Sequence, residues 1–328
     1  MLAAALGMCL RLENRPQQWG ATAFAGRYRP PMNFLVVGEA LVDLVRGRDG
    51  SVVTRAGGSP ANVAVGLGRL GYDVQLLTAL GDDPHGRLLT DHLEDSGVQV
   101  LAAPLASTGL AQAILDGAGK ADYVLDITWD LAGLTPPTAP DWLHLGSIGA
   151  TLQPGADHAA ALLDRYASQA RTSYDPNCRP LLMGDADLVR PRIESLVGKC
   201  DVVKLSDEDA AWLLPGLDPE AVLRRWATSG PSLVAMTLGE RGVVALVDGQ
   251  VLEVSVPHGP PIVDTVGAGD AFMTGLIAAL SEGASGHEAL TRASLLARRT
   301  CERVGADPPW AETLVNFPGG ERAGTGRR

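Results

Sequence analysis

The stretch DTVGAGDAF, residues 264–272, joins a turn of small residues to a carboxylate. Gly267, Ala268 and Gly269 follow a strand-like PIVD and precede the apolar segment AFMTGLIAAL, which is expected to be a helix. Unpaired N–H groups and the helix dipole meet at such a helix start and favour a phosphate group. Asp270 stands at the mouth of this turn, where it could accept a proton. An ordinary glycine-rich loop with an aspartate in the first helical turn would give the same pattern.

Phosphoryl transfer to an alcohol requires alignment, stabilisation of charge and a proton acceptor, rather than covalent chemistry from the protein. The glycine turn would stabilise charge and Asp270 would accept the proton. Four further stretches place polar residues at strand ends or helix starts: GEALVDLV (38–45), AGGSPANVAVGLGRLG (56–71), DPNCR (175–179) and TLGERG (237–242). Ligands of open α/β sheets bind beyond the carboxyl ends of the strands, so five such stretches can converge on one cleft.

The motif GLGRLG, residues 66–71, matches the G-x-G-x-x-G fingerprint of dinucleotide-binding proteins. That fingerprint requires a strand before it and a helix that opens at the glycines. Here Ser59 and Pro60 open a helix as its N-cap and first residue, and the glycines lie inside and at the end of it. We therefore interpret Gly66 and Gly68 as sites of close helix packing and Gly71 as the helix C-cap.

The order of elements predicts an α/β fold with a mostly parallel sheet. Strand-like runs at 34–38, 74–80, 141–146, 171–175, 201–205 and 231–239 alternate with helical segments, and residues 241–256 form a hairpin that turns at Asp248-Gly249. Alternating stretches near 50–57 and 108–128 interrupt this rhythm and indicate half-exposed antiparallel strands. They are expected to form a small projecting sheet, a lid over the cleft whose exposed face could pair with another subunit.

Composition narrows the class of protein further. The chain has 328 residues and a formal net charge of −11, which disfavours nucleic acid and an anionic membrane surface as main partners. Its four cysteines form no C-x-x-C pair, which favours reduced thiols in the cytoplasm over a disulfide framework or zinc site. No apolar run is long enough to span a bilayer. Residues 1–31 and 319–328 lack periodic patterns and are expected to be disordered.

These motifs identify a resemblance to the PfkB (ribokinase-like) carbohydrate kinases over residues 33–312. AGGSPANVAVGLGRLG and DTVGAGDAF are similar to the two signatures of that family, and GEALVDL, GGSPANVA, DPNCR and VVKLSDED resemble its fructokinase branch. The resemblance implies a Rossmann-like sheet with helices on both faces and a small β-sheet lid. It places the kinase domain at 32–318, with lid segments near 45–57 and 101–130.

The resemblance also implies a role for each matching residue. Asp270 would be the general base, and Gly267, Ala268 and Gly269 would hold the transferred phosphoryl. The sugar would be bound by residues on three of the stretches, namely Asp43, Gly57, Gly58, Asn62, Asp175, Asn177 and Arg179. The nucleotide would be bound by Lys204, Ser206, Asp209, Thr237, Gly239 and Gly242. Carbonyl groups near Asp264, Val266 and Gly305 would coordinate a monovalent cation such as K⁺.

One motif departs from the family pattern. Many members carry Asn-x-x-Glu to support Mg²⁺ and the phosphates, and this chain has Ser206 and Asp209 at those positions. A contact to Mg²⁺ through water tolerates that change, since Mg²⁺ usually keeps several waters. Equally, Ser206 could simply cap a helix, with Asp209 as a carboxylate of its first turn.

The resemblance implies a cytoplasmic kinase that uses ATP and Mg²⁺, most similar to enzymes acting on fructose. Arg179 keeps an acidic acceptor open, so kinases for 2-keto-3-deoxygluconate, ribose or a nucleoside are alternatives within the family. A non-catalytic sensor of sugar or nucleotide on the same fold is an alternative of another class, although such a binder would not need Asp270. A homodimer through the lid sheets is a further expectation from the resemblance.

Overall fold

The computed structural model describes residues 32–46, 51–115 and 121–315. The expected disordered segments, 1–31 and 319–328, lie outside the described residues. None of the described helices is both long and apolar enough to cross a membrane.

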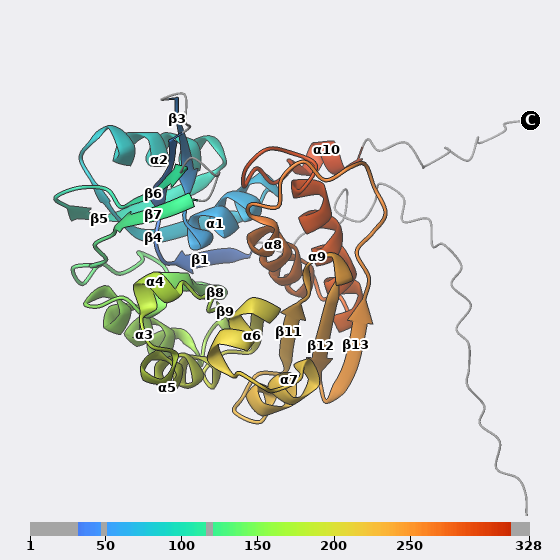
Figure 1. The fold of residues 1–328 in the computed structure, drawn as a ribbon. Coiled ribbons are helices and arrows are strands. Elements are labelled where there is room, and N and C mark those ends of the chain that lie inside the picture. Colours follow the sequence, from blue (N-terminus) through green and yellow to red (C-terminus); the bar gives the residue numbers. More distant parts are fainter. Residues whose placement is uncertain (1–31, 47–50, 116–120, 316–328) are drawn as a thin grey trace, which may run out of the picture.

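A nine-stranded sheet forms the centre of the fold, in the order β13-β12-β11-β10-β9-β8-β1-β4-β5 (Figure 1). The pairs from β11 to β5 are parallel, and β12 and β13 add an antiparallel hairpin at one edge. Its strands are β1 (Asn33–Val37), β4 (Asp73–Gly81), β5 (Val98–Leu105), β8 (Trp142–Gly146), β9 (Arg171–Asp175), β10 (Val202–Ser206), β11 (Leu233–Thr237), β12 (Val243–Val247) and β13 (Gln250–Val254). The strands buried on both faces are apolar runs, as expected for a parallel sheet.

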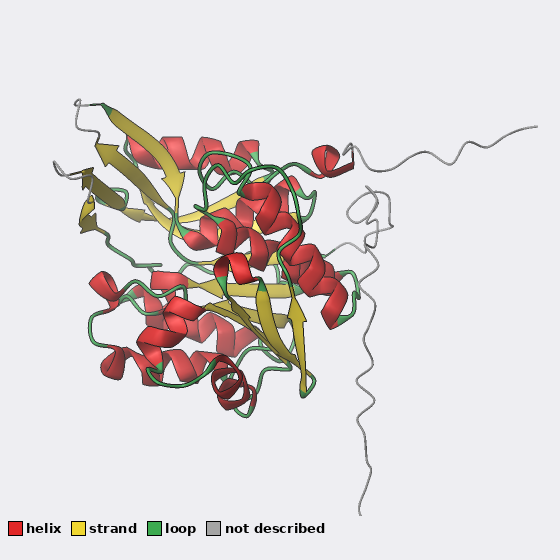
Figure 2. Ribbon diagram, turned by 45° about the vertical axis from the view of Figure 1, so that its right-hand side comes forward, coloured by secondary structure: helices red, strands yellow, loops and turns green. Residues whose placement is uncertain are grey.

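Helices cover both faces of this sheet (Figure 2). One face packs against α1 (Ser59–Arg69), α2 (Pro84–Asp95), α8 (Ala268–Ser281) and α9 (Gly286–Thr300). The other packs against α3 (Gly155–Tyr166), α5 (Ala186–Val197), α6 (Asp207–Leu213) and α7 (Pro219–Ala227). Shorter elements are η1 (Ser147–Ala150), α4 (Pro180–Met183), η2 (Gly239–Arg241) and α10 (Ala311–Val315). The predicted α/β class with helices on both faces is confirmed.

A separate four-stranded sheet, order β3-β2-β6-β7, projects from the main body. It consists of β2 (Leu41–Arg46), β3 (Val52–Gly57), β6 (Leu110–Leu115) and β7 (Ala121–Asp126). This lid begins earlier than expected, at Leu41, because β2 follows β1 after a short turn. The expected lid segment near 101–130 was wrong at its start, since residues up to Leu105 belong to β5, which pairs in parallel with β4 in the large sheet.

Three local expectations were wrong or incomplete. Ser59 is not the N-cap of α1; Gly58 is, and the serine hydroxyl is used elsewhere. The segment PIVD forms no strand, and the N–H groups of Val263 and Asp264 instead donate to the carbonyl of Cys301. Helices α5 and α7 were not expected from the sequence. The hairpin at Asp248-Gly249 is confirmed.

Candidate active site

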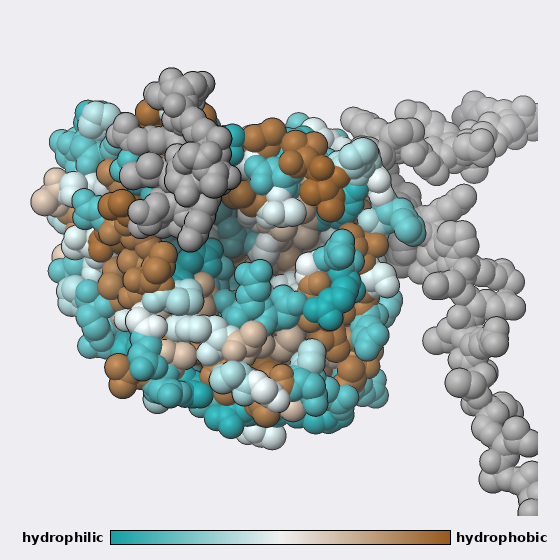
Figure 3. All heavy atoms as spheres, in the orientation of Figure 1, coloured by the Kyte–Doolittle hydropathy of each residue, from teal (hydrophilic) through white to brown (hydrophobic). Residues whose placement is uncertain are grey.

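A cavity of about 180 Å³ lies between the lid and the carboxyl ends of the parallel strands. Figure 3 shows a hydrophilic hollow near the middle of this face of the molecule. The polar side chains lining the cavity are Glu39, Asp43, Ser59, Asn62, Ser147, Arg179 and Asp270. Its apolar wall comes from both the lid and the body, and includes Leu41, Ala111, Leu125, Ile127, Ile148, Leu182 and Val266. Four of the five stretches expected to converge contribute residues to this cavity, whereas no residue of TLGERG lines it.

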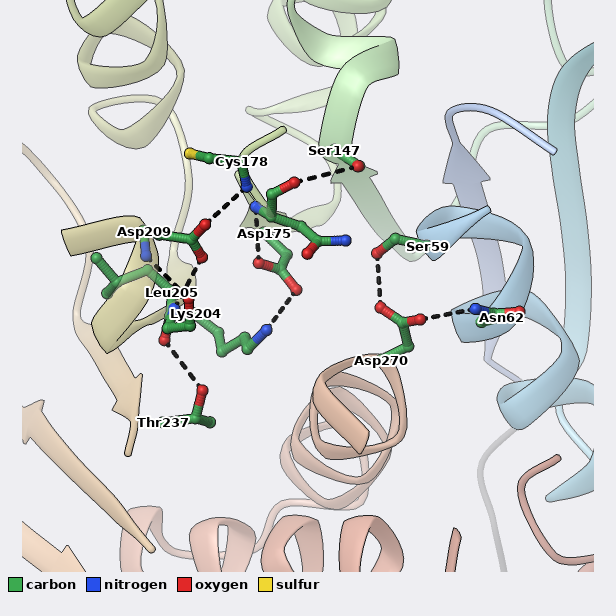
Figure 4. Close-up of polar contacts among 12 residues, drawn as sticks. Ser59, Asn62, Ser147, Asp175, Cys178, Lys204, Leu205, Asp209, Thr237 and Asp270 are labelled. Atoms are coloured by element: carbon green, nitrogen blue, oxygen red, sulfur yellow. Dashed lines mark hydrogen bonds and ion pairs between the residues drawn. The ribbon is translucent and has the colours of Figure 1, made fainter. Parts of the chain in front are cut away.

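Asp270 is held by two hydrogen bonds from α1. Ser59 Oγ donates to Oδ1 at 2.7 Å and Asn62 Nδ2 donates to Oδ2 at 2.7 Å (Figure 4). The carboxylate is 8% exposed and borders the cavity. Since an ionised carboxylate has about four lone-pair sites, each oxygen can still accept a further proton donor. The two bonds therefore fix the orientation of Asp270 without using up its capacity as a base.

The glycine turn has the backbone geometry of an open helix start. Gly267 is the N-cap of α8, with φ 75°, and no side chain caps the helix. A Cβ on Gly267 would lie 2.5 Å from Cβ of Ala306, so neither the conformation nor the space suits another residue. No side chain occupies the N–H groups at this helix start, although the Ala268 N–H donates to the carbonyl of Thr265 at 3.2 Å. A helix start of this kind favours an anion.

Asp43 lines the cavity from β2, and Arg179 lines it from the loop before α4. Burial raises the pKa of the Asp43 carboxyl, whereas the charges of Arg179 and Arg55 lower it. A Cβ on Gly57 would lie 2.2 Å from Oδ2 of Asp43, so this glycine makes room for the carboxylate rather than contacting the cavity. Of the expected sugar ligands, Asp43, Gly58, Asn62 and Arg179 all line the cavity.

Hydrogen bonds inside the protein hold the DPNCR loop in place. Asn177 adopts φ 36°, a left-handed conformation, and its N–H donates to Oδ1 of Asp175 at 3.2 Å. Its carbonyl accepts a bond of 3.4 Å from the hydroxyl of Ser147, which is also left-handed with φ 57°. Such strained residues persist only where their surroundings hold them, and they cluster at functional sites. Asp175 itself is fully buried and lies behind the cavity wall rather than on it.

Asp175 and Lys204 form a buried ion pair, with Nζ 2.8 Å from Oδ2. Burial raises the pKa of Asp175 to about 6, although the charge of Lys204 opposes this. Burial also disfavours the charged form of Lys204, but Asp175, Asp209 and Asp270 together outweigh it and raise the pKa of the ammonium. The pairing therefore favours the charged form of each group against its burial.

Ser206 and Asp209 form the capping box of α6. Ser206 Oγ accepts from Asp209 N–H at 3.0 Å, and Asp209 Oδ2 accepts from Ser206 N–H at 2.9 Å. The other oxygen, Oδ1, accepts from Cys178 N–H at 2.7 Å and so ties the DPNCR loop to β10 (Figure 4). The capping alternative is confirmed, and Asp209 has the additional task of holding that loop.

Of the residues expected to bind nucleotide, Lys204 and Ser206 lie in β10, Asp209 in α6, Thr237 at the end of β11, and Gly239 and Gly242 in and after η2. Thr237 Oγ1 donates to the carbonyl of Leu205 at 3.4 Å. Gly239 and Gly242 have φ values of 58° and 93°, so the turn between them requires glycine. A Cβ on Gly242 would meet the carbonyl of Val254 at 2.2 Å, whereas the space beside Gly239 is open within 4 Å. The turn exposes backbone next to the strand ends.

The three positions expected around a monovalent cation are brought together by one carboxylate. Asp264 Oδ2 accepts from Gly305 N–H at 2.8 Å and Oδ1 accepts from Val266 N–H at 3.1 Å. The bond from Val266 is the main cause that lowers the pKa of this carboxyl. Arg55 of the lid approaches Oδ2 at 3.9 Å. The loop before the glycine turn is thus fastened to the segment after α9.

Three polar residues that line the cavity, Glu39, Ser59 and Ser147, were missed from the sequence. Ser59 was assigned to capping, yet it orients Asp270. Glu39, just after β1, is 4% exposed, lines the cavity and accepts from Gly149 N–H at 2.9 Å. Burial raises the pKa of Glu39 to about 7, against hydrogen bonds and the charge of Arg179. A carboxylate directly after the first buried strand was a signal that could have identified Glu39.

Comparisons with known proteins give consistent matches over most of the chain. The model of the "pfkB family carbohydrate kinase" matches residues 33–313. A fructokinase of Klebsiella pneumoniae is 33% identical over 297 residues, covering 86% of this chain and 95% of that protein. A fructokinase of Rhizobium leguminosarum bv. trifolii is 34% identical over 263 residues, covering 75% and 79%. A fructokinase double mutant of Vibrio cholerae O395, crystallised with fructose, ADP and potassium ion, superposes with a TM-score of 0.75 at 27% identity, covering 85% of this chain and 95% of that one.

Proposed function

Because this chain belongs to the pfkB family of carbohydrate kinases, we propose that it transfers the γ-phosphoryl group of ATP to a hydroxyl of fructose. The observation that carries the proposal is the geometry of Asp270. This carboxylate is oriented by two donors from α1 and stands between a polar cavity and an open helix start. An attacking hydroxyl and a phosphoryl group would meet at that position.

The charges of the cavity favour a neutral acceptor. Glu39, Asp43 and Asp270 line it together with one cation, Arg179. The Arg179 guanidinium donates to three oxygens of its own loop. These are the Asn177 carbonyl at 3.1 Å, Asn177 Oδ1 at 2.8 Å and the Cys178 carbonyl at 2.9 Å. An acidic sugar would bring a further negative charge beside these carboxylates, whereas a polyol offers hydroxyl donors to them. This supports fructose over 2-keto-3-deoxygluconate.

In the proposed reaction, Asp270 acts on the oxygen of the sugar hydroxyl and the glycine turn acts on the oxygens of the transferred phosphoryl group. Asp270 accepts the proton of the sugar hydroxyl as it attacks the γ-phosphorus, while the bond from that phosphorus to the bridging oxygen of ADP breaks. The N–H groups of Gly267, Ala268 and Gly269 hold the equatorial oxygens of the transferred group. The lid closes the cavity against water, which would otherwise compete with the sugar.

Mg²⁺ enters this proposal with ATP, as part of the substrate. Asp209 does not suit direct coordination, because both of its oxygens accept bonds from backbone N–H groups and it is 6% exposed. The described residues contain no cluster of three or more histidine, cysteine or acidic side chains that could hold a metal. The turn of Thr237, Gly239 and Gly242 would carry the nucleotide with backbone groups.

A monovalent cation is a separate proposal. Asp264 brings the loop of Val266 and the segment of Gly305 together, which is the arrangement needed for carbonyl groups of both to surround one ion. The related fructokinase of Vibrio cholerae O395 was crystallised with potassium ion. Replacing KCl with the chloride of a bulky organic cation should lower kcat if the ion shapes the glycine turn.

We also propose a homodimer through the lid sheets and a cytoplasmic location, where ATP is supplied. Val52 and Val124 are 47% and 51% exposed on β3 and β7 of the lid. Burial of these side chains against a second lid would remove apolar surface from water. Light scattering of the wild type and of a Val52→Glu, Val124→Glu variant tests this, because a dimer held elsewhere would persist in the variant.

A substrate panel tests the function itself. ADP release would be coupled to an indicator reaction and measured with fructose, ribose, 2-keto-3-deoxygluconate and a nucleoside. We expect kcat/KM to be highest for fructose. A clear preference for another acceptor would contradict the choice of sugar, and binding of ATP and sugar without turnover would favour a sensor.

A further inference from the structure

The ion pair of Lys204 and Asp175 is a costly arrangement that calls for an explanation. Their side chains are 4% and 0% exposed, and they stand on neighbouring strands, β10 and β9. Removing two charges from water costs free energy, and a protein with an apolar pair of similar volume in their place is often as stable or more stable. Stability alone is therefore a weak reason for a lysine at this position.

The ammonium lies directly against the glycine turn. A Cβ built on Gly269 would be 3.0 Å from Nζ of Lys204, so the absence of a side chain at residue 269 makes room for the charge. Figure 4 shows Lys204 pointing towards Asp175, between the capping residues of α6 and the carboxylate of Asp270. The first turn of α8 thus has a fixed positive charge beside it.

The surroundings would otherwise repel phosphate. Asp175, Asp209 and Asp270 all interact electrostatically with Lys204, whose ammonium lies beside Gly269 of the turn that should bind an anion. Helix dipoles contribute only about half an elementary charge at their N-terminus. Without the ammonium, these carboxylates would lack the positive charge that opposes their repulsion of a phosphate.

On the basis of the proposed function, we propose that Lys204 is a positioning residue for phosphoryl transfer. Its ammonium, fixed by Asp175 beneath Gly269, gives the backbone N–H groups of the turn a positive environment in which they can hold the phosphates of ATP. Asp175 accordingly serves to orient and retain that charge behind the cavity wall, rather than to contact the sugar. Such a preorganised charge stabilises negative charge without reorganising during the reaction.

The test neutralises the pair without leaving one charge unpaired. In the double variant Lys204→Met, Asp175→Asn, the methionine keeps most of the buried stem and neither residue is charged. Calorimetry would measure binding of ADP and, separately, of fructose, and steady-state kinetics would give kcat and KM for ATP. We expect affinity for ADP to fall and kcat to drop roughly tenfold to a hundredfold, at or somewhat below the loss of one anion-hole donor. Fructose affinity and Tm should stay close to those of the wild type.

A buried ion pair elsewhere gives the matched control. Arg292 and Glu282 join α9 to the end of α8 at 2.6 Å, with side chains 4% and 11% exposed. Arg292→Met, Glu282→Gln should alter Tm and leave the affinity for ADP unchanged. If the Lys204 variant does not fold, Lys204→Gln, Asp175→Asn provides a neutral pair that can still hydrogen bond.

Two outcomes would overturn the role of Lys204. One is unchanged affinity for ADP and unchanged kcat in the folded double variant. The other is a loss that affects fructose, ADP and Tm alike, because that would be a structural effect. Failure of the proposed function can be told apart from failure of the role of Lys204. If the wild type phosphorylated no sugar, calorimetry could still compare the binding of ADP to the wild type and to the double variant.

Discussion

Replacing Asp270 with asparagine removes the proposed base while preserving nearly all of its shape. The wild-type carboxylate accepts from Ser59 Oγ on one oxygen and from Asn62 Nδ2 on the other. If the amide nitrogen of the new asparagine faced Asn62, two hydrogen-bond donors would point at each other. The opposite orientation is suitable, because the Ser59 hydroxyl can rotate to accept from the new amide while the remaining oxygen accepts from Asn62.

The magnitudes follow from that geometry. Two charge-assisted bonds become two neutral ones, which should cost about 1–2 kcal/mol of folding free energy. For a domain of this size that is a fall in Tm of roughly 2–8 °C. The loss of the base should lower kcat roughly 10²–10⁴-fold, the usual contribution of general-base catalysis.

Coupled measurement of ADP release, with calorimetric binding of ATP and fructose, would check these values for Asp270→Asn. Asp83→Asn is the matched control, since Asp83 also accepts two hydrogen bonds, in its case from the backbone N–H groups of Gly86 at 2.8 Å and Thr108 at 2.7 Å, at the start of α2. The control should lose stability and keep its kcat. If Asp270→Asn kept more than about a tenth of wild-type kcat, well above the expected range, Asp270 would not be the base.

Three further changes test other parts of the site. Asp43→Ala should raise KM for fructose roughly tenfold to a hundredfold and leave KM for ATP nearly unchanged, because it removes an acceptor for sugar hydroxyls; equal changes in both constants would contradict this. Glu39 has a pKa raised from 4.5 to about 7, so its burial lowers wild-type stability progressively as pH rises through that range. In urea unfolding, the free energy of unfolding of Glu39→Gln relative to that of the wild type should therefore increase between pH 5 and 8, by up to about 3 kcal/mol. A difference that does not depend on pH would refute burial of the Glu39 charge as its cause. Gly267→Ala should lose more stability and far more kcat than Gly283→Ala, since both have left-handed φ values of 75° and 79° but only the first would meet a neighbour within 4 Å.

The site was predictable wherever one strand end or helix start carried its own signal. Parallel strands bring their carboxyl ends to one edge, so Arg179, in the loop after β9, could be assigned to the cleft, and the glycine turn could be assigned from its helix start. Asp43 was assigned there as a residue just past the first strand, although it lies within lid strand β2. The link between Ser59 and Asp270 could not be found in this way, because it joins residues 211 positions apart. In sequence, a serine before a proline is typical of a helix cap, which concealed its second use.

The errors in the fold also have physical causes. Strand β5 lies at the edge of the large sheet and mixes buried, half-buried and exposed residues, so it resembles a half-exposed strand of the lid. Helix α5 contains Pro191 in its interior, which disfavours a helix in any reading of local propensity. Packing of Ile193, Leu196 and Val197 against the sheet outweighs that preference.

Transfer of the labelled γ-phosphoryl group of ATP, with products separated after incubation with fructose, tests the central claim most directly. We expect nearly all of the label in a fructose phosphate, with ADP formed in equal amount and almost no inorganic phosphate. Omitting fructose should abolish ADP formation, because the lid and the carboxylate together disfavour attack by water. Label found mainly in inorganic phosphate, at the same rate with and without fructose, would contradict a sugar kinase.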